Sequence, residues 1–191
     1  SVPTGTVKEL VALAKAHPGK LTYASAGTGS ATHLGTELLK YSAGIDLLHI
    51  PYKSAGLATS ALLAGETQIL MTNMASVLPH VRSGRIKALG VSSRQRSRLA
   101  PDLPTVAEAG VPGFEYSTWY GMFVPAGTPQ LIVNRLHADV ANIIKTPQLR
   151  ERFAVQGLDV YGSSAADFDA FVGREIAKWS KVALATGVRA E

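Results

Sequence analysis

The chain has 191 residues, of which 46% are hydrophobic and 17% charged. This is typical of a globular protein with one domain, or one domain and part of another, and it excludes disordered and collagen-like classes. The net charge is +5. The absence of cysteine excludes disulfides, thiolate nucleophiles, zinc ribbons and Fe–S clusters. No run approaches the ~18 apolar residues that a membrane-spanning helix requires.

The first half of the chain predicts strands and helices in strict alternation. A capping-box pattern, Thr6 to Glu9, begins a helix that ends at Pro18. Further helices are expected over residues 31–43, 57–64 and 76–82, and strands over residues 21–25, 46–52, 68–71 and 86–92. Short apolar strands separated by helices of about ten residues are typical of parallel βαβ units. We therefore predict an α/β fold with a parallel-rich sheet flanked by helices.

The positive charge is concentrated in one stretch. Between Thr67 and Pro101 there is no acidic residue, and the six basic residues found there account for the whole net charge. They are Arg82, Arg85, Lys87, Arg94, Arg96 and Arg98. The densest part, residues 92–98, contains no aromatic residue and so lacks the stacking platforms of single-strand binders. We expect a solvated basic loop and no nucleic-acid partner.

The pattern changes after this loop. Residues 101–105 should lead into a short helix, and residues 114–124 should be an extended aromatic stretch. Amphipathic helices are expected over residues 131–145, over residues 149–156 and from Ser164, which can cap the last helix together with Asp167. Their apolar stripes exceed what two short strands after Val111 could cover. We therefore expect part of their packing surface to lie outside this chain.

A glycine-rich stretch between a strand and a helix is the best candidate for a binding site. Small residues allow backbone N–H groups to approach a ligand, and a helix N-terminus favours negative charge. Hydroxyl donors add hydrogen bonds without adding charge, which suits a carboxylate that must be released. The alternative is a tight turn in which Ser30 or Thr32 only caps the helix. The candidate ligand-binding residues of this stretch are Ser25, Gly27, Thr28, Gly29, Ser30, Thr32 and His33.

More specific motifs for nucleotide binding, nucleophilic catalysis and metal binding do not match these residues. Walker A requires a Lys after its glycines, and the next one here is Lys40; the dinucleotide fingerprint requires a third Gly where Thr32 stands. A nucleophile elbow requires glycines two residues to either side of its serine, which Ser30 lacks. His33 and His49 do not have the metal-ligand spacing of a helix. We therefore predict no catalytic residue, no metal site and no cofactor. A phosphate-binding enzyme stays open only with His33 as its base.

Two later strand ends are also candidates. In open α/β sheets, ligands bind outside the carboxyl ends of the strands, where Lys53 and Asn73 are expected. Lys53 could face the site or be an exposed loop lysine, and Asn73 could donate an amide hydrogen bond or only form a local turn. Trp119 and Tyr120 could belong to a core or contribute to a binding wall.

Several of these segments together resemble one family. The chain is similar to the periplasmic solute receptors of tripartite tricarboxylate transporters, also called Bug or TctC-like proteins. The segments that carry the resemblance are Ala14–Ser25, Gly27–Ser30 with His33, Leu34 and Glu37, His49–Lys53, Ala88–Val91, Pro101–Gly110, Trp119–Gly121 and Pro125–Pro129. The likeness departs at Ser54, where members usually have Gly, and at Thr72, where many have Asp.

The resemblance implies a fold like that of type II periplasmic-binding proteins, with two lobes that close on a small solute. Residues 1–115 would form lobe 2, and residues 116–191 the crossover and an incomplete C-terminal part of lobe 1. The receptor would capture a di- or tricarboxylate or an aromatic acid in the periplasm, without catalysis. It would deliver this solute to the membrane permease subunits of the transporter. One carboxylate would sit in the loop that matches Ser25 to His33, often with ordered water.

The resemblance also implies that a second glycine-rich clamp, together with a signal peptide, lies upstream of the sequence supplied. One loop supplies a few hydrogen bonds of ~0.5 to 1.5 kcal/mol each, whereas micromolar binding requires ~8 kcal/mol. We therefore expect this chain alone to bind solute weakly or not at all. An incomplete lobe further predicts a homodimer or an exchanged dimer. The alternative from another class is the ligand-sensing domain of a transcription regulator with the same lobed fold.

Overall fold

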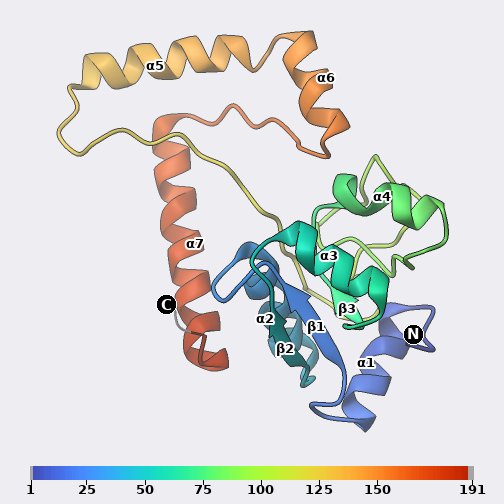
Figure 1. Cartoon of the computed structure of the whole chain (residues 1–191). Coiled ribbons are helices and arrows are strands. Elements are labelled where there is room, and N and C mark those ends of the chain that lie inside the picture. The colour runs from blue at the N-terminus through green and yellow to red at the C-terminus, as the bar shows by residue number, and fades with distance from the viewer. Residues whose placement is uncertain (1, 189–191) are drawn as a thin grey trace. The chain divides into compact units, whose positions relative to one another are not determined.

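The computed structural model describes residues 2–188, which fall into two compact units (Figure 1). The first unit comprises the residues up to 118 and those from 181 onward, and the second comprises residues 119–180. Each unit is described by itself below. The assignment of residues 1–115 and 116–191 to two lobes stays a prediction.

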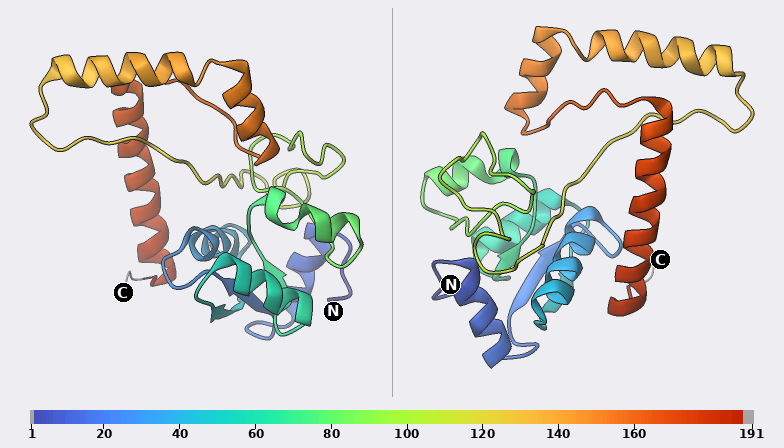
Figure 2. Two further views of the ribbon diagram at one scale, coloured as in Figure 1. Left: turned by 45° about the horizontal axis from the view of Figure 1, so that its top comes forward. Right: turned by 180° about the vertical axis from the view of Figure 1, so that it is seen from behind.

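The first unit is built on a sheet of three parallel strands in the order β2-β1-β3. The strands are β1 (Thr22–Ser25), β2 (Leu48–Pro51) and β3 (Ile69–Leu70), and the helices are α1 (Val7–Ala16), α2 (Ala31–Ala43), α3 (Ala55–Ala64) and α4 (Met74–Arg82). Because the chain moves from β1 to one neighbour and then to the other, right-handed crossovers place α2 and α3 on opposite faces of the sheet (Figures 1 and 2). The α/β fold with parallel strands is thereby confirmed.

The core of this unit surrounds the central strand. Tyr23 and Ala24 of β1 are completely buried. Leu10 and Ala14 of α1 pack in one cluster with Tyr23 and with Leu47, which precedes β2. A central strand that is covered on both faces gives the residues at its carboxyl end a fixed position.

Side-chain caps determine where the helices begin. Thr6 and Glu9 form the predicted capping box of α1, with Oγ1 of Thr6 accepting from the Glu9 N–H at 3.1 Å. The predicted bounds of α2 are confirmed. Helix α3 begins at Ala55 rather than Leu57, because the Ser54 hydroxyl accepts from the Leu57 N–H at 3.3 Å and caps the helix earlier.

Two predicted elements are absent from the first unit. Residues 86–92 form no strand, because loop segments rather than one continuous partner take up their backbone groups. Val91 forms only an isolated parallel bridge with Thr105, and the Ser92 carbonyl accepts from the Tyr116 N–H at 2.8 Å. The short helix expected after residue 105 is a single turn, in which the Ala109 N–H donates to the Thr105 carbonyl at 2.9 Å. Residues 114–124, which run from the first unit into the second and were predicted to be extended, form neither a helix nor a strand.

The basic stretch is tied to this turn by one ion pair. Arg96 lies 2.9 Å from the Glu108 carboxylate, which also accepts from the Thr105 N–H at 2.9 Å. The Thr105 N–H and the Arg96 guanidinium lower the pKa of Glu108. Arg82, Arg85, Lys87, Arg94, Arg96 and Arg98 are all exposed, as expected for a solvated basic loop.

The second unit is helical. It contains α5 (Gln130–Ile143), α6 (Pro147–Val155) and most of α7 (Ala165–Thr186), as predicted, with the Ser164 hydroxyl accepting from the Asp167 N–H at 3.1 Å. Trp119 packs edge to face against Phe171 with ring centroids 5.3 Å apart, so it belongs to a local aromatic cluster. Tyr120 is 80% exposed.

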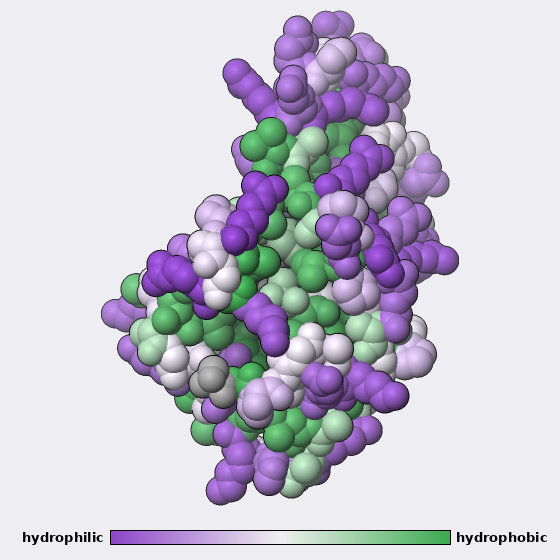
Figure 3. All heavy atoms as spheres, turned by 90° about the vertical axis from the view of Figure 1, so that its right-hand side faces the viewer, coloured by the Kyte–Doolittle hydropathy of each residue, from purple (hydrophilic) through white to green (hydrophobic). Residues whose placement is uncertain are grey.

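Large apolar side chains remain open to solvent. In the second unit Leu131 is 81% exposed and Val155 is 71% exposed. On the face drawn in Figure 3, hydrophobic residues lie at the surface between hydrophilic ones. The described residues therefore leave apolar helix faces uncovered, as the sequence predicted.

Candidate functional site

The glycine loop, residues 25–33, connects the carboxyl end of β1 to the first turn of α2. Gly27 and Gly29 have φ angles of 117° and 74°, which favour glycine. The loop is closed by its own hydrogen bonds: the Ser30 hydroxyl donates to the Gly27 carbonyl at 2.6 Å, and the Ala26 N–H donates to Thr32 Oγ1 at 2.8 Å. These internal hydrogen bonds hold the loop in its shape.

Three backbone donors of this loop have no acceptor among the described residues. They are the N–H groups of Thr28, Ala31 and Thr32, and Thr28 and Ala31 are exposed. Ala31 and Thr32 are the first residues of α2, a helix of 13 residues, where the partial positive charge of the helix is concentrated. This arrangement can bind an anion.

Other candidate residues of the loop bond inside the protein. The Gly27 N–H donates to the Ser25 hydroxyl at 3.1 Å, the Gly29 N–H donates to His33 Nδ1 at 3.0 Å, and Ser30 caps α2. Ser25 is completely buried and His33 is 5% exposed. These residues shape the loop, whatever else they contact.

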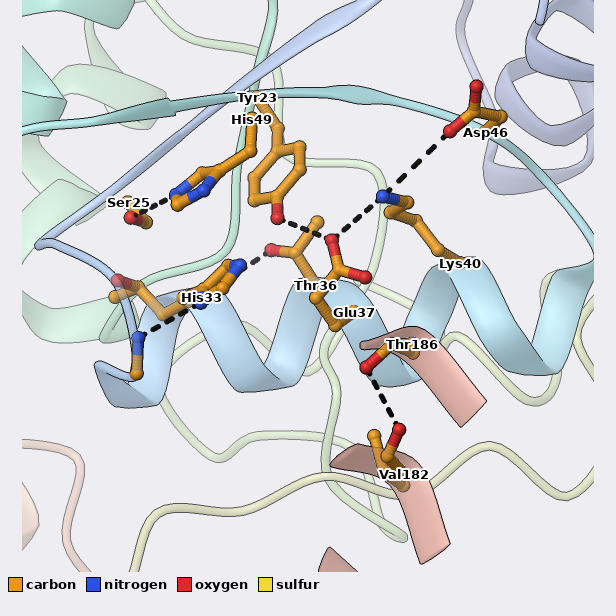
Figure 4. Close-up of polar contacts among 12 residues, drawn as sticks. Tyr23, Ser25, His33, Thr36, Glu37, Lys40, Asp46, His49, Val182 and Thr186 are labelled. Carbon is orange, nitrogen blue, oxygen red and sulfur yellow. Dashed lines mark hydrogen bonds and ion pairs between the residues drawn. The ribbon is translucent and has the colours of Figure 1, made fainter. Parts of the chain in front are cut away.

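A stack of three rings lies beneath the loop (Figure 4). The rings of His33 and His49 are 4.0 Å apart and nearly parallel, and the His49 ring is 4.8 Å from that of Tyr23. Nε2 of His49 lies 2.6 Å from the Ser25 hydroxyl. The stack therefore contacts both ends of the glycine loop.

A buried acid follows the stack. Glu37, 5% exposed, accepts from the Tyr23 hydroxyl at 2.5 Å and pairs with Lys40 at 2.8 Å. Lys40 also lies 3.9 Å from the Asp46 carboxylate. Burial, followed by the hydrogen bond to Glu37, raises the pKa of Tyr23, so its hydroxyl is a donor at neutral pH.

Folding favours the neutral form of both histidines. Burial lowers the pKa of His33, and burial together with the nearby His33 lowers the pKa of His49 to about 4. Glu37 acts in the opposite direction and Lys40 in the same direction on both. Because the unfolded chain binds these protons more readily, the stability contributed by the neutral rings is present above about pH 6.5. It is lost as the pH falls toward 4.

Sequence reasoning missed Tyr23, Glu37, Lys40 and the pairing of the two histidines. Tyr23 and His49 are register partners on neighbouring strands, so their side chains lie on one face. His33 and Glu37 are four residues apart on α2, so they also share a face. The spacing from His33 to Glu37 was visible in the sequence, whereas the strand register was not.

The other two candidates lie after strands of the same sheet. The Tyr52 N–H donates to the Ser25 carbonyl at 3.0 Å, which brings the segment before Lys53 to the loop. Lys53 is exposed. Asn73 caps α4, with its side-chain oxygen accepting from the Ala75 N–H at 2.8 Å. A role for either residue in binding stays a prediction.

Within residues 2–188, no cluster of His, Asp and Glu side chains could hold a metal ion. Among the same residues, no helix combines the length and the apolar character needed to cross a membrane. The chemistry that the described site supports is hydrogen bonding to an anion by uncharged groups.

Comparison with known proteins identifies the family. A family model described as the tripartite tricarboxylate transporter family receptor matches residues 1–188. The chain belongs to this receptor family. The resemblance given by the sequence is thereby confirmed, and the family is one of solute receptors rather than enzymes.

Individual members of this receptor family support the assignment. The chain is 37% identical over 177 residues to the UPF0065 protein in the tcbD-tcbE intergenic region of Pseudomonas sp. (strain P51), covering 92% of this chain and 53% of that protein. The solved structure of R. palustris Rpa4515 with adipate is 34% identical, with a TM-score of 0.86 over 98% of this chain and 63% of that one. The periplasmic binding protein BugD is 32% identical, with a TM-score of 0.83 over 100% and 64%. The chain thus spans about half the length of its curated relative, and the fold is that of periplasmic binding proteins.

Proposed function

We propose that this receptor captures a small carboxylate at the glycine loop and delivers it to a tripartite tricarboxylate transporter. The observation that supports this most directly is the group of three backbone donors, from Thr28, Ala31 and Thr32, that lack an acceptor among the described residues at the start of α2. The similar structure of Rpa4515 contains adipate, a dicarboxylate. The matched family favours transport over the alternative of a regulator domain.

The chemistry of the loop favours a carboxylate that is bound reversibly. The loop has no Lys or Arg, so it offers dipoles and hydroxyl groups rather than full positive charges. Hydrogen bonds to a charged carboxylate contribute ~1.5 to 3 kcal/mol each and a helix terminus ~0.3 to 1 kcal/mol, but association costs at least ~4 kcal/mol, so the net remains below the ~8 kcal/mol of micromolar binding. We therefore propose that the loop alone binds with millimolar affinity.

Titration with adipate tests this proposal. Backbone amide NMR signals of Thr28, Ala31 and Thr32 should shift with a millimolar dissociation constant, because these groups donate to the carboxylate. The variant Thr28→Glu places a carboxylate at the exposed tip and should weaken adipate binding by about tenfold or more.

Ser60→Glu is the matched control for this charge change. Ser60 is exposed on α3, so the variant adds the same charge away from the loop and should bind adipate like the natural chain. Loop amides that do not move in saturating adipate would contradict the proposal, as would equal binding by Thr28→Glu and the natural chain.

The cellular setting follows from the family. We propose that the whole receptor works in the periplasm, catalyses no reaction and contacts the membrane permease subunits of its transporter. Lys53 and Asn73 are proposed as further solute contacts, since both follow strands at the edge of the sheet where the loop lies.

We also propose that copies of this chain associate through the second unit. Leu131, Ile143, Val155 and Ile176 are more than half exposed there, and apolar faces of this kind mark interaction sites. Light scattering should give a mass above the 20.1 kDa of one chain. A strictly monomeric chain would rule this association out.

A further inference from the structure

We infer that His33 is a positioning residue for solute binding, whose neutral Nδ1 holds the glycine loop in its binding shape and whose protonation releases it. The inference deepens the proposed function and rests on it, because the glycine loop is taken to be the carboxylate site. It predicts that solute affinity falls on acidification, and it gives His33, a candidate ligand-binding residue, a role in supporting the loop rather than in contacting solute.

The hydrogen bond between His33 and the loop has a defined donor and a defined acceptor. The Gly29 N–H donates to His33 Nδ1 at 3.0 Å, so this nitrogen must present a lone pair. A neutral imidazole that accepts at Nδ1 carries its proton on Nε2. A protonated imidazole carries a proton on both nitrogens and would direct an N–H at the Gly29 N–H. Protonation therefore replaces an attraction with a repulsion at the tip of the loop.

The His33 ring cannot easily turn away from this contact. It is 5% exposed and stacks on the His49 ring at 4.0 Å with 8° between the planes, and Tyr23 lies beyond His49. Gly29 has a φ of 74° and directly precedes Ser30, which caps α2. A displacement of Gly29 is therefore transmitted to Thr28 on one side and to the first turn of α2 on the other.

His49 does not have the same role. Its Nε2 lies 2.6 Å from the Ser25 hydroxyl, which can donate to that nitrogen or accept from it. The contact therefore survives whether His49 is neutral or protonated. A positive charge on His49 would nevertheless lie 4.0 Å from the His33 ring and oppose a second proton there.

The elements packed against the stack contribute groups that favour or oppose protonation of the histidine rings. Burial is the largest influence on the His33 ring and opposes its protonation. On helix α2, Glu37 favours the protonated ring and Lys40 opposes it. Strand β1 supplies the Tyr23 hydroxyl, which is bonded to Glu37, and Asp46 before β2 reaches the stack only through Lys40. Helix α3 has no titratable residue, and α1 meets Tyr23 with Leu10 and Ala14.

NMR on the intact chain without any carboxylate tests the positioning role. Between about pH 7.5 and about pH 4.5, the Gly29 amide signal should move with the titration of the His33 ring. His33→Asn places Oδ1 near the position of Nδ1 and cannot be protonated, so its Gly29 signal should stay constant. His17→Asn, at an exposed histidine in the same unit, should behave like the natural chain.

Adipate affinity over the same pH range completes the experiment, with circular dichroism confirming that the chain stays folded. Protonation of adipate itself lowers the affinity of both proteins as the pH falls, so the natural chain should lose about fivefold to tenfold more affinity than His33→Asn over this range. A Gly29 signal that ignores the titration of His33 would overturn the inference, as would a His33 that stays neutral until the chain unfolds. If Gly29 follows His33 but adipate binds at no pH, adipate capture fails and the positioning role of His33 stands.

Discussion

Replacing Glu37 with alanine should lower the free energy of unfolding of the first unit by about 3 kcal/mol. The carboxylate is 5% exposed and bonds at once to the Tyr23 hydroxyl and to Lys40. Its removal leaves a hydroxyl without an acceptor on a completely buried tyrosine, which costs ~1 to 3 kcal/mol. Lys40 keeps 18% of its side chain exposed and has Asp46 nearby, so its share of the loss should be smaller. Urea unfolding followed by circular dichroism measures the difference.

A double-mutant cycle separates the two partners of Glu37. Tyr23→Phe combined with Glu37→Ala should cost clearly less than the sum of the single variants, because either change alone breaks the same hydrogen bond. Glu66→Gln is the control in the same unit, since the Tyr52 hydroxyl donates to the Glu66 carboxylate at 3.2 Å on the exposed surface and this hydrogen bond should contribute little. Equal losses for Glu37→Ala and Glu66→Gln would show that burial of the Glu37 pair has no energetic consequence.

The bounds of α1 and α2 could be predicted from their side-chain caps and from Gly44, whereas α3 and α4 begin two residues before their predicted starts because the caps Ser54 and Asn73 were overlooked. Thr6 and Glu9 predict the start of α1, and Ser30 and Gly44 predict the two ends of α2, because caps depend only on neighbours in the sequence. The glycine loop was predicted for the same reason. Its hydroxyl groups, its glycines and the helix that follows are contiguous.

Properties that depend on distant partners could not be predicted. Residues 86–92 have the apolar character of a strand, but a strand requires a continuous partner, and the structure gives Val91 only a bridge to Thr105. The histidine stack depends on the register between β1 and β2, which pairs Tyr23 with His49. A shift of one residue would have placed His49 on the opposite face of the sheet.

The candidate site therefore consists of an exposed layer and a buried layer that differ in their chemistry. The exposed layer consists of backbone donors around Thr28 and has no charge of its own. The buried layer consists of Tyr23, His33, His49 and Glu37 and carries the ionisable groups. In the proposed function, a loop without Lys or Arg releases its anion readily, and the buried side chains hold the loop in its shape.

The close packing of α2 gives the second large expected effect, from Gly35→Ala. A Cβ at this position would lie 2.5 Å from Cε1 of Tyr116 and 2.7 Å from the sulfur of Met71. Tyr116 is buried and its hydroxyl donates to the Ala31 carbonyl at 2.6 Å, so the ring is fixed over the first turn of the helix. Overpacking of up to ~3 kcal/mol is only partly offset by the ~1 kcal/mol that alanine gains over glycine in a helix. We therefore expect a net loss of about 2 kcal/mol in urea unfolding.

Gly56→Ala is the control that separates the effect of close packing from that of helix propensity. Gly56 is exposed on α3 in the same unit, and the nearest atom to an added Cβ is the Ser54 hydroxyl at 3.9 Å. Gly56→Ala should therefore be neutral or more stable by up to about 1 kcal/mol, since only helix propensity changes. Because Tyr116 bonds to Ala31, the Gly35→Ala variant should also shift the amide signals of Ala31 and Thr32, whereas Gly56→Ala should leave them in place. Equal stability of the two variants would mean that the Tyr116 ring can move aside without cost, and the first turn of α2 would then not be fixed by this contact.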